Sequence, residues 1–404
     1  MENKAISRKY YLDWLRVIMI LSVFIFHSLR FFNLDGWHIK NLSTYWSAEV
    51  LIQSLAIWLM PLGFVISGAA VYYALGKGAA GLSGAGKYVK DKVLRLLVPL
   101  VVGIFTHSAF QVYLERRTHG QFSGSFWEFY PHYFEGMYGF DGGNFGWMGI
   151  HLWYLEMLFV FCLVFLPLLL WIRRGWGQKL LARLGNLLAV PGAAILLAVP
   201  VILVLNLVDE NSPWGMDAFG GWSILSHACF FLSGFVIGSN ERLLHSIQRL
   251  RWVWLAGAAG MIAWQITSWV IRSNALAGFP TYEFDLELTD LMAYSSIFAF
   301  LGFGMQRLNA NATSLPRLNE AVLPFYILHQ PVLLSVGYFV LQWPIPDLFK
   351  WLVIAIVSFA VIVGMYELVV RRINPLRFLF GMKLLAKASP MPATEAALAG
   401  GKIR

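Results

Sequence analysis

The sequence predicts an all-α polytopic membrane protein with about ten transmembrane helices and with both termini in the cytoplasm. Three observations support this fold class: the composition, the recurrence of long apolar stretches, and the distribution of lysine and arginine between the loops. Of the 404 residues, 58% are hydrophobic and only 13% are charged, and the mean hydropathy is +0.62. Because soluble chains carry about 25% charged residues, this composition excludes an ordinary soluble protein.

Apolar stretches long enough to cross a bilayer recur ten times. A hydrocarbon core of about 30 Å needs about 17 to 25 helical residues. The expected spans cover residues 12–32, 50–75, 94–113, 151–171, 187–207, 222–239, 252–271, 289–305, 321–342 and 350–370. Residues 1–385 are therefore expected to form a single transmembrane domain, and the polar remainder, 386–404, a disordered cytoplasmic tail.

The lysines and arginines concentrate in alternate loops, a pattern typical of cytoplasmic loops. The first group precedes residue 12, the second lies between the second and third spans, and the last follows residue 370. Both termini are therefore expected in the cytoplasm, which an even number of spans allows. The formal net charge of +9 then requires no nucleic-acid partner.

The first span, RVIMILSVFIFH at residues 16–27, begins with an arginine and ends with a histidine. The two side chains are about 16 Å apart along a helix, so they cannot touch. His27 is a catalytic candidate because an imidazole titrates near neutral pH and can take a proton from a hydroxyl; the alternative is a hydrogen bond between helices. For Arg16, the alternatives to a functional role are a local ion pair with Asp13 and snorkelling to the membrane interface.

Three ionisable residues of later spans are further candidates, because such groups usually face an interior or a cavity. His151 lies at the mouth of the fourth span and His329 near the middle of the ninth, where they could position a reacting group or stabilise an oxyanion. Glu156 could orient an imidazole or face a wet vestibule. No set of histidines and carboxylates has the spacing of a metal site, so no metal is expected.

A basic run, KYVKDKVLRLLVP at residues 87–99, precedes the third span. Lys92 and Arg95 within it could hold phosphates through charge-assisted hydrogen bonds. The alternative is that the run only marks a cytoplasmic loop and contacts lipid headgroups. The outer loop at residues 114–149 is rich in aromatic side chains, which could stack on a carbohydrate; an interfacial aromatic belt is the preferred interpretation.

Six stretches together resemble the membrane acyltransferase 3 family. They run from the first span to the tail and comprise YYLDWLRVIMILSVFIFH (10–27), MPLGFVISGAAVYY (60–73), KVLRLLVP (92–99), HLWYLEML (151–158), LPFYILHQPVLL (323–334) and YELVVRRINPLRFLFGMK (366–383). The last three resemble most closely the branch that includes the succinyltransferases of bacterial periplasmic glucans.

The resemblance implies an O-acyltransferase of the bacterial inner membrane. Its donor would be a cytoplasmic acyl-CoA, acetyl-CoA or succinyl-CoA, and its acceptor a hydroxyl of an extracytoplasmic carbohydrate such as a glucan. His27 would be the catalytic histidine and Arg16 its partner on the donor side. Arg95 would match the second arginine of the family's Arg-x-x-Arg element, in which Lys92 replaces the first; a lysine keeps the charge but loses the bidentate fork.

A proton-coupled secondary transporter for a small solute or glycan precursor is the main alternative. Ten spans, intramembrane histidines and prolines near helix positions would suit such a carrier. Against it, the sequence has no visible internal repeat and no paired set of broken helices. The sequence leaves open the acyl group, the acceptor and the oligomeric state; membrane lipids are the only other partners expected.

Overall fold

The computed structural model describes residues 8–76, 82–139, 142–273 and 285–385. These residues form helices joined by loops, and they contain no β-strand, only an isolated bridge between Met137 and Phe145. The predicted all-α class is therefore confirmed for this part of the chain. The tail at residues 386–404, for which disorder was predicted, lies outside the described residues.

Helices of very different length make up the fold. In the first half of the chain they are α1 (Tyr10–Leu29), α2 (Trp46–Gly76), α3 (Leu82–Lys92), η1 (Val93–Leu97), α4 (Val98–Gly103), η2 (Ile104–Ser108), α5 (Ala109–Thr118), α6 (Phe126–Phe129), η3 (His132–Phe134), η4 (Ile150–Leu152), α7 (Trp153–Val164), α8 (Leu166–Ile172), α9 (Gly175–Leu188), η5 (Ala193–Ala198) and α10 (Val199–Leu207). In the second half they are α11 (Ile224–Ser239), α12 (Glu241–Arg249), α13 (Arg251–Ser273), α14 (Asp285–Arg307), α15 (Leu315–Val340), α16 (Asp347–Met365), η6 (Tyr366–Val370) and α17 (Asn374–Leu379).

Among the described residues, six helices are long and apolar enough to cross a membrane, or seven if the bent pair α7–α8 with η4 is one span. The chain is therefore a multi-pass membrane protein. The other predicted spans correspond to two shorter apolar helices, Ala193–Leu207 and Ile224–Ser239, and to α13. The count of ten spans and the cytoplasmic location of both termini remain predictions.

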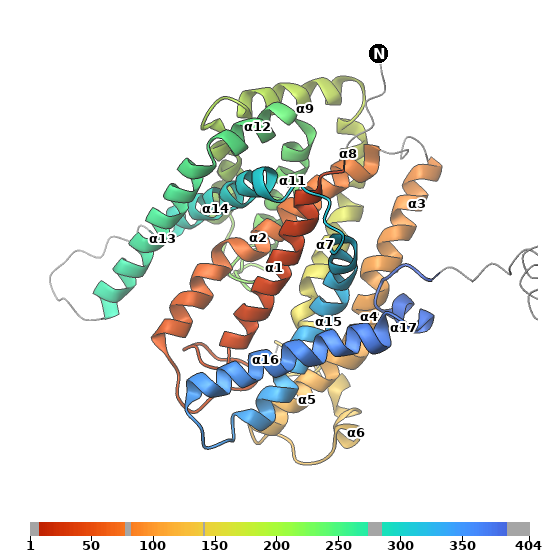
Figure 1. Cartoon of the computed structure of the whole chain (residues 1–404), viewed down its shortest axis with the longest axis vertical. Helices are drawn as coiled ribbons and strands as arrows, with labels where there is room; N and C mark the ends of the chain where they lie inside the picture. Colours follow the sequence, from red (N-terminus) through yellow and green to blue (C-terminus); the bar gives the residue numbers. More distant parts are fainter. Residues whose placement is uncertain (1–7, 77–81, 140–141, 274–284, 386–404) are drawn as a thin grey trace, which may run out of the picture.

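Helix α1 packs against α2, α14, α15 and α16 and leaves Leu21 and Ile25 exposed on one face (Figure 1). Its twenty residues contain neither glycine nor proline, and its apolar side chains on several faces are buried, among them Leu15, Met19 and Val23. A helix that is hydrophobic all round is expected in a protein core or across a membrane. Arg16 and His27 are therefore carried into the interior of the bundle on one rigid element.

Helices α2 and α11 pack closely because two glycines face each other's backbone. A Cβ atom at Gly68 would lie 1.9 Å from the carbonyl oxygen of Phe231, and one at Gly234 would lie 2.0 Å from that of Val65. Small residues allow such close packing of helices in membranes. The contact fixes the position of α2, which borders both of the cavities described below.

The segment Gly84–Thr118 is one continuous helix that contains two π-helical turns, η1 and η2. A π-helical turn widens the helix locally and is frequent at functional sites. Arg95 lies in η1. The local widening therefore coincides with the basic run that the sequence singled out.

The segment between α5 and η4 packs against α5 at the end of the molecule opposite the start of α1 (Figure 1). Phe129 and Tyr133 are buried in it, and a capping box between Ser125 and Glu128 starts α6. Trp127, by contrast, is exposed. An interfacial aromatic belt stays a prediction for such exposed aromatic side chains. The segment forms a cap over one end of the bundle.

Candidate functional site

Two cavities follow one another along α1. The first, of about 870 Å³, is bordered by Arg16, Met19 and Ile20, and we call it the basic cavity. The second, of about 500 Å³, is bordered by Val23, Phe26 and His27, and we call it the histidine cavity. Helices α2, α7 with η4, and α15 also contribute to both. Arg16 and His27 therefore serve different cavities, as their spacing on the helix requires.

Cations outnumber carboxylates around the basic cavity. Its lining includes two carboxylates, Asp91 and Glu320, and six cationic side chains, namely Arg16, Lys92, Arg95, Arg317, Arg371 and Lys383. The structure thus brings together all three residues that the sequence assigned to a donor site. An excess of lysine and arginine over carboxylates suits an anionic ligand such as a phosphate.

Arg16 is held from two sides at the edge of the basic cavity. Its guanidinium donates to the side-chain oxygen of Asn319 over 3.2 Å and forms an ion pair with Asp13 over 3.3 Å. The local pair with Asp13, considered above as an alternative, is therefore present together with the exposure of Arg16 to the cavity. The second contact, from α15, fixes a residue of α1 relative to another helix.

His27 contacts His329 directly. Nδ1 of His27 lies 3.0 Å from the carbonyl oxygen of Val23 and 3.1 Å from Nε2 of His329, whose own Nδ1 faces the carbonyl oxygen of Tyr326. A carbonyl only accepts, so both Nδ1 atoms carry the hydrogen in the neutral rings. Nε2 of His27 then keeps its lone pair, and the ring borders the histidine cavity. The contacts select the tautomer of His27 that can act as a base or nucleophile.

His151 completes a group of three histidines, since its ring centroid lies 5.2 Å from that of His329. Gln111 donates to Nδ1 of His151 over 3.2 Å, and Nε2 of His151 donates to the carbonyl oxygen of Ile327 over 3.1 Å. Both nitrogens of His151 and both of His329 therefore have partners. These contacts favour a positioning role over the stabilisation of an oxyanion, which would need a free N–H group.

Tyr326 borders both cavities. Its hydroxyl donates to the carbonyl oxygen of His151, and its ring stacks on that of His329 with an interplanar angle of 28°. Tyr326 therefore lies where the two cavities adjoin, and it contacts both His151 and His329.

Glu156 does not join this group. It lies in α7 and borders neither cavity, and its Oε2 atom is buried with no hydrogen-bond partner among the described residues. The proximity of Glu156 to His151 in the sequence thus does not produce a contact between the two side chains.

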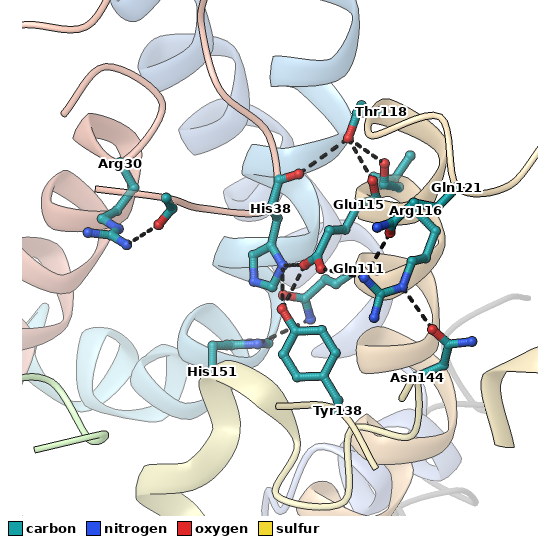
Figure 2. A network of polar contacts seen from close by, with 12 residues as sticks. Arg30, His38, Gln111, Glu115, Arg116, Thr118, Gln121, Tyr138, Asn144 and His151 are labelled. Carbon is teal, nitrogen blue, oxygen red and sulfur yellow. Dashed lines mark hydrogen bonds and ion pairs between the residues drawn. The ribbon is translucent and has the colours of Figure 1, made fainter. Parts of the chain in front are cut away.

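A second polar cluster next to the histidine cavity was missed in the sequence. His38, in the loop between α1 and α2, hydrogen-bonds to Glu115 of α5, and Tyr138 of the cap donates to the same carboxylate over 2.7 Å (Figure 2). The only local signal was a carboxylate, Glu115, at the end of an apolar span. Its partner is 77 residues away in the chain, so no spacing rule could reveal the pair.

A family model for an acyltransferase domain, of the acyltransferase 3 type, matches residues 9–367. The chain belongs to the membrane acyltransferase 3 family. The match begins just before α1 and ends in η6, so it includes all of the histidines described above. No curated protein and no solved structure matches the chain significantly. The resemblance read from the six stretches is confirmed at the level of the family, and the glucan-modifying branch remains a prediction.

Proposed function

We propose that the protein is an O-acyltransferase of the bacterial inner membrane, which moves an acetyl or succinyl group from cytoplasmic acyl-CoA to a hydroxyl of an extracytoplasmic carbohydrate such as a glucan. One observation carries the proposal: Arg16 and His27 lie on one helix but border two successive cavities that share Tyr326. A reaction with a donor from one side and an acceptor from the other needs this arrangement.

The basic cavity is the proposed donor site. The phosphates of CoA would bind the cationic side chains of this cavity, Lys92 and Arg95 among them. The extended arm of the donor would pass Arg16, Met19 and Ile20 and reach His27, about 16 Å from Arg16 along the helix. The cationic side chains match the anionic phosphates of such a donor, and the apolar side chains of Met19 and Ile20 line the path of its arm.

The histidine cavity is the proposed acceptor site. Trp37 and Trp153 contribute indole rings to its lining, and Gln53, Gln330 and Asp217 contribute polar groups. Aromatic faces beside a few hydrogen-bonding side chains suit the apolar faces and hydroxyls of a sugar. The cavity volume of about 500 Å³ admits part of a glycan rather than a whole polymer.

Nε2 of His27 is the proposed reactive atom, with two possible routes. In the first, it takes the proton of the acceptor hydroxyl while the hydroxyl oxygen attacks the thioester carbon, and the carbon–sulfur bond breaks. In the second, Nε2 attacks the thioester carbon itself and carries the acyl group until the acceptor takes it. The carbonyl of Val23 and the imidazole of His329 would hold the ring in the reactive tautomer in both routes.

The test is acyl transfer from labelled acetyl-CoA or succinyl-CoA to periplasmic glucans by purified protein in proteoliposomes. We expect His27→Ala to lower the transfer rate by about 10² to 10⁴, the usual contribution of a general base. The matched control is His132→Ala in the cap, which should transfer normally. Normal transfer by folded His27→Ala protein would exclude the proposal.

The same proteoliposomes test the transporter alternative. A carrier would accumulate a labelled glycan precursor in response to a proton gradient and would release no thiol from acyl-CoA. The proposed enzyme should release one thiol for each ester formed and should accumulate no solute.

A further inference from the structure

His38 is one of three histidines that border the histidine cavity, together with His27 and His151. Its side chain and that of Glu115 are only 6% and 10% exposed, whereas the other histidine–glutamate pair at this end of the molecule, His132 and Glu135, is 51% and 67% exposed. Burial of an ionisable pair costs free energy, so a pair that is buried beside a cavity is a candidate for a functional site.

The hydrogen bonds select the tautomer of His38. Nδ1 contacts the carboxylate of Glu115, which only accepts, so Nδ1 carries the hydrogen (Figure 2). Nε2 then keeps a lone pair, and no contact to a protein atom is found for it among the described residues. The carboxylate also accepts from the hydroxyl of Tyr138 over 2.7 Å, which fixes its orientation. This is the geometry of a carboxylate-oriented general base.

His38 and His27 differ in the hydrogen-bond partners of their Nδ1–H groups. The Nδ1–H group of His27 meets neutral partners, the carbonyl of Val23 and the imidazole of His329. That of His38 meets a carboxylate, which stabilises the positive charge formed when Nε2 takes a proton. His38 is therefore better equipped to take up a proton, and His27 to act as a neutral nucleophile.

The cap holds the pair in place. Arg116 contacts Oε1 of Glu115 over 3.3 Å and donates to Asn144 over 2.8 Å and to the carbonyl of Gly143 over 3.0 Å. Thr118 donates to the backbone oxygen of His38 over 3.3 Å (Figure 2). The cap and α5 thus converge on one histidine beside the cavity.

We propose that His38 is a second catalytic residue, the general base for the acceptor hydroxyl, with Glu115 and Tyr138 as positioning residues. The inference rests on the proposed function, since it assumes acyl transfer to a hydroxyl in the histidine cavity. It selects the two-step route, in which His27 carries the acyl group while His38 serves the acceptor.

The two steps balance. Nε2 of His27 attacks the thioester carbon, the carbon–sulfur bond breaks, and the thiolate leaves with the electron pair and takes a proton from water. The acceptor oxygen then attacks the acyl carbon as its proton passes to Nε2 of His38. The carbon–nitrogen bond breaks, its electron pair returns to His27, and His38 releases the proton to water.

The first experiment measures thiol release from labelled acyl-CoA in the absence of acceptor, followed by transfer after acceptor is added. We expect His38→Gln to release one equivalent of thiol per protein, as the wild type does, and to lose transfer by at least about 10²-fold. His132→Gln is the matched control and should transfer normally. Normal transfer by His38→Gln, or loss of its thiol burst, would overturn the inference.

A second readout does not depend on the folding of that variant. Glu115→Gln should move the acid limb of the pH–rate profile to lower pH, because the carboxylate no longer stabilises the protonated imidazole. The charged and titratable groups that face His38 or its cavity are Glu115, Arg116, Tyr138, His27, His151, Arg30, Asp35, Asp217 and Tyr326. Tyr138→Phe should lower the rate and leave the limb nearly in place. An unchanged acid limb in Glu115→Gln would also overturn the inference.

The two proposals fail in different ways. If His27→Ala loses transfer but His38→Gln does not, only the role of His38 is wrong. If His27→Ala retains transfer, the proposed function itself is wrong.

Discussion

The two cavities of this protein are built on different principles. Around the basic cavity the charged side chains are long and partly exposed; Arg95 and its partner Asp91, for example, are 44% and 49% exposed. In the histidine cavity, His27 and His151 are fixed by buried partners, His329, Gln111 and backbone carbonyls. Binding of a charged group tolerates adjustment of the side chains, whereas proton and acyl transfer depend on geometry. Substitutions in the basic cavity should therefore change KM for the donor, and those in the histidine cavity should change kcat.

The largest effect that tests this contrast is expected at His329. His329→Leu removes one of the two acceptors of the Nδ1–H group of His27 and leaves only the carbonyl of Val23, so the orientation of the ring is less firmly fixed. We expect kcat to fall about 100-fold, the size of the effect of small displacements at reacting centres, with little change in KM for the donor. Steady-state kinetics measure both constants.

The control for this variant is His329→Gln, whose side-chain oxygen can accept the same hydrogen bond. It should recover part of the lost kcat. Equal activity of the leucine and glutamine variants would mean that His329 contributes only packing.

Arg16→Met should have the next largest effect, and this effect should be on KM for the donor rather than on kcat. The variant loses the hydrogen bond to Asn319 and would lose the proposed charge-assisted contact with the donor. We expect KM for acyl-CoA to rise about 30-fold, as for the loss of a hydrogen bond to a charged group, while Arg16→Lys keeps part of the affinity. A fall in kcat alone would mean that Arg16 takes part in the reaction step, and it would contradict the expectation that the basic cavity affects only KM.

Lys92→Ala should have a smaller effect on the same constant. The Lys92 ammonium lies 5.0 Å from the ring centroid of Tyr88 and borders the cavity. We expect KM for the donor to rise about 3-fold, typical of an exposed charge pair, and the difference from the wild type to shrink at high salt. Lys92→Arg should bind the donor at least as well as the wild type; an effect that does not depend on salt would contradict a phosphate contact.

The smallest predicted effect concerns the loop that carries Trp37 and His38. The Lys40 ammonium donates to the carbonyl oxygens of Arg30 and Asn33, and partial burial, together with the charge of Arg30, lowers the pKa of Lys40 to about 8. The unfolded chain then binds more protons than the folded one between about pH 8 and 10.5, so this group makes the free energy of unfolding rise with pH in that range.

Thermal unfolding of the wild type and of Lys40→Met, followed between pH 7 and 10.5, measures this contribution. The melting temperature of the wild type minus that of the variant should increase by a few degrees as the pH rises, because only the wild type has the titrating ammonium of Lys40. A difference that is constant with pH would show that Lys40 keeps an ordinary pKa.

The sequence predicted the parts of this molecule that depend on composition and on short-range spacing. A long apolar run identifies a buried helix such as α1, and the interval between Arg16 and His27 already excluded a contact between them. Arg16, Lys92 and Arg95 line one cavity, and their role in binding a donor stays a prediction.

The contacts between distant segments could not be predicted in this way. His27 and His329 are 302 residues apart, and His38 and Glu115 are 77 residues apart. Helix packing determines these pairs, and one sequence contains no periodicity that encodes which helices are neighbours. The same limit applies to Glu156, which is close to His151 along the chain. His151 lies in η4 and Glu156 in α7, and the chain does not bring their side chains into contact.

The position of Tyr326 also bears on the permeability of the membrane. Both cavities border this one side chain, so the proposed donor arm would pass beside Tyr326 and take the place of water there. One elementary charge moving across 100 mV is worth about 2.3 kcal/mol, so a permanent path for protons or ions would drain the energy that the membrane stores. A donor arm that fills the passage beside Tyr326 would keep water out of it, so the proposed transfer across the bilayer would leave the bilayer an insulator.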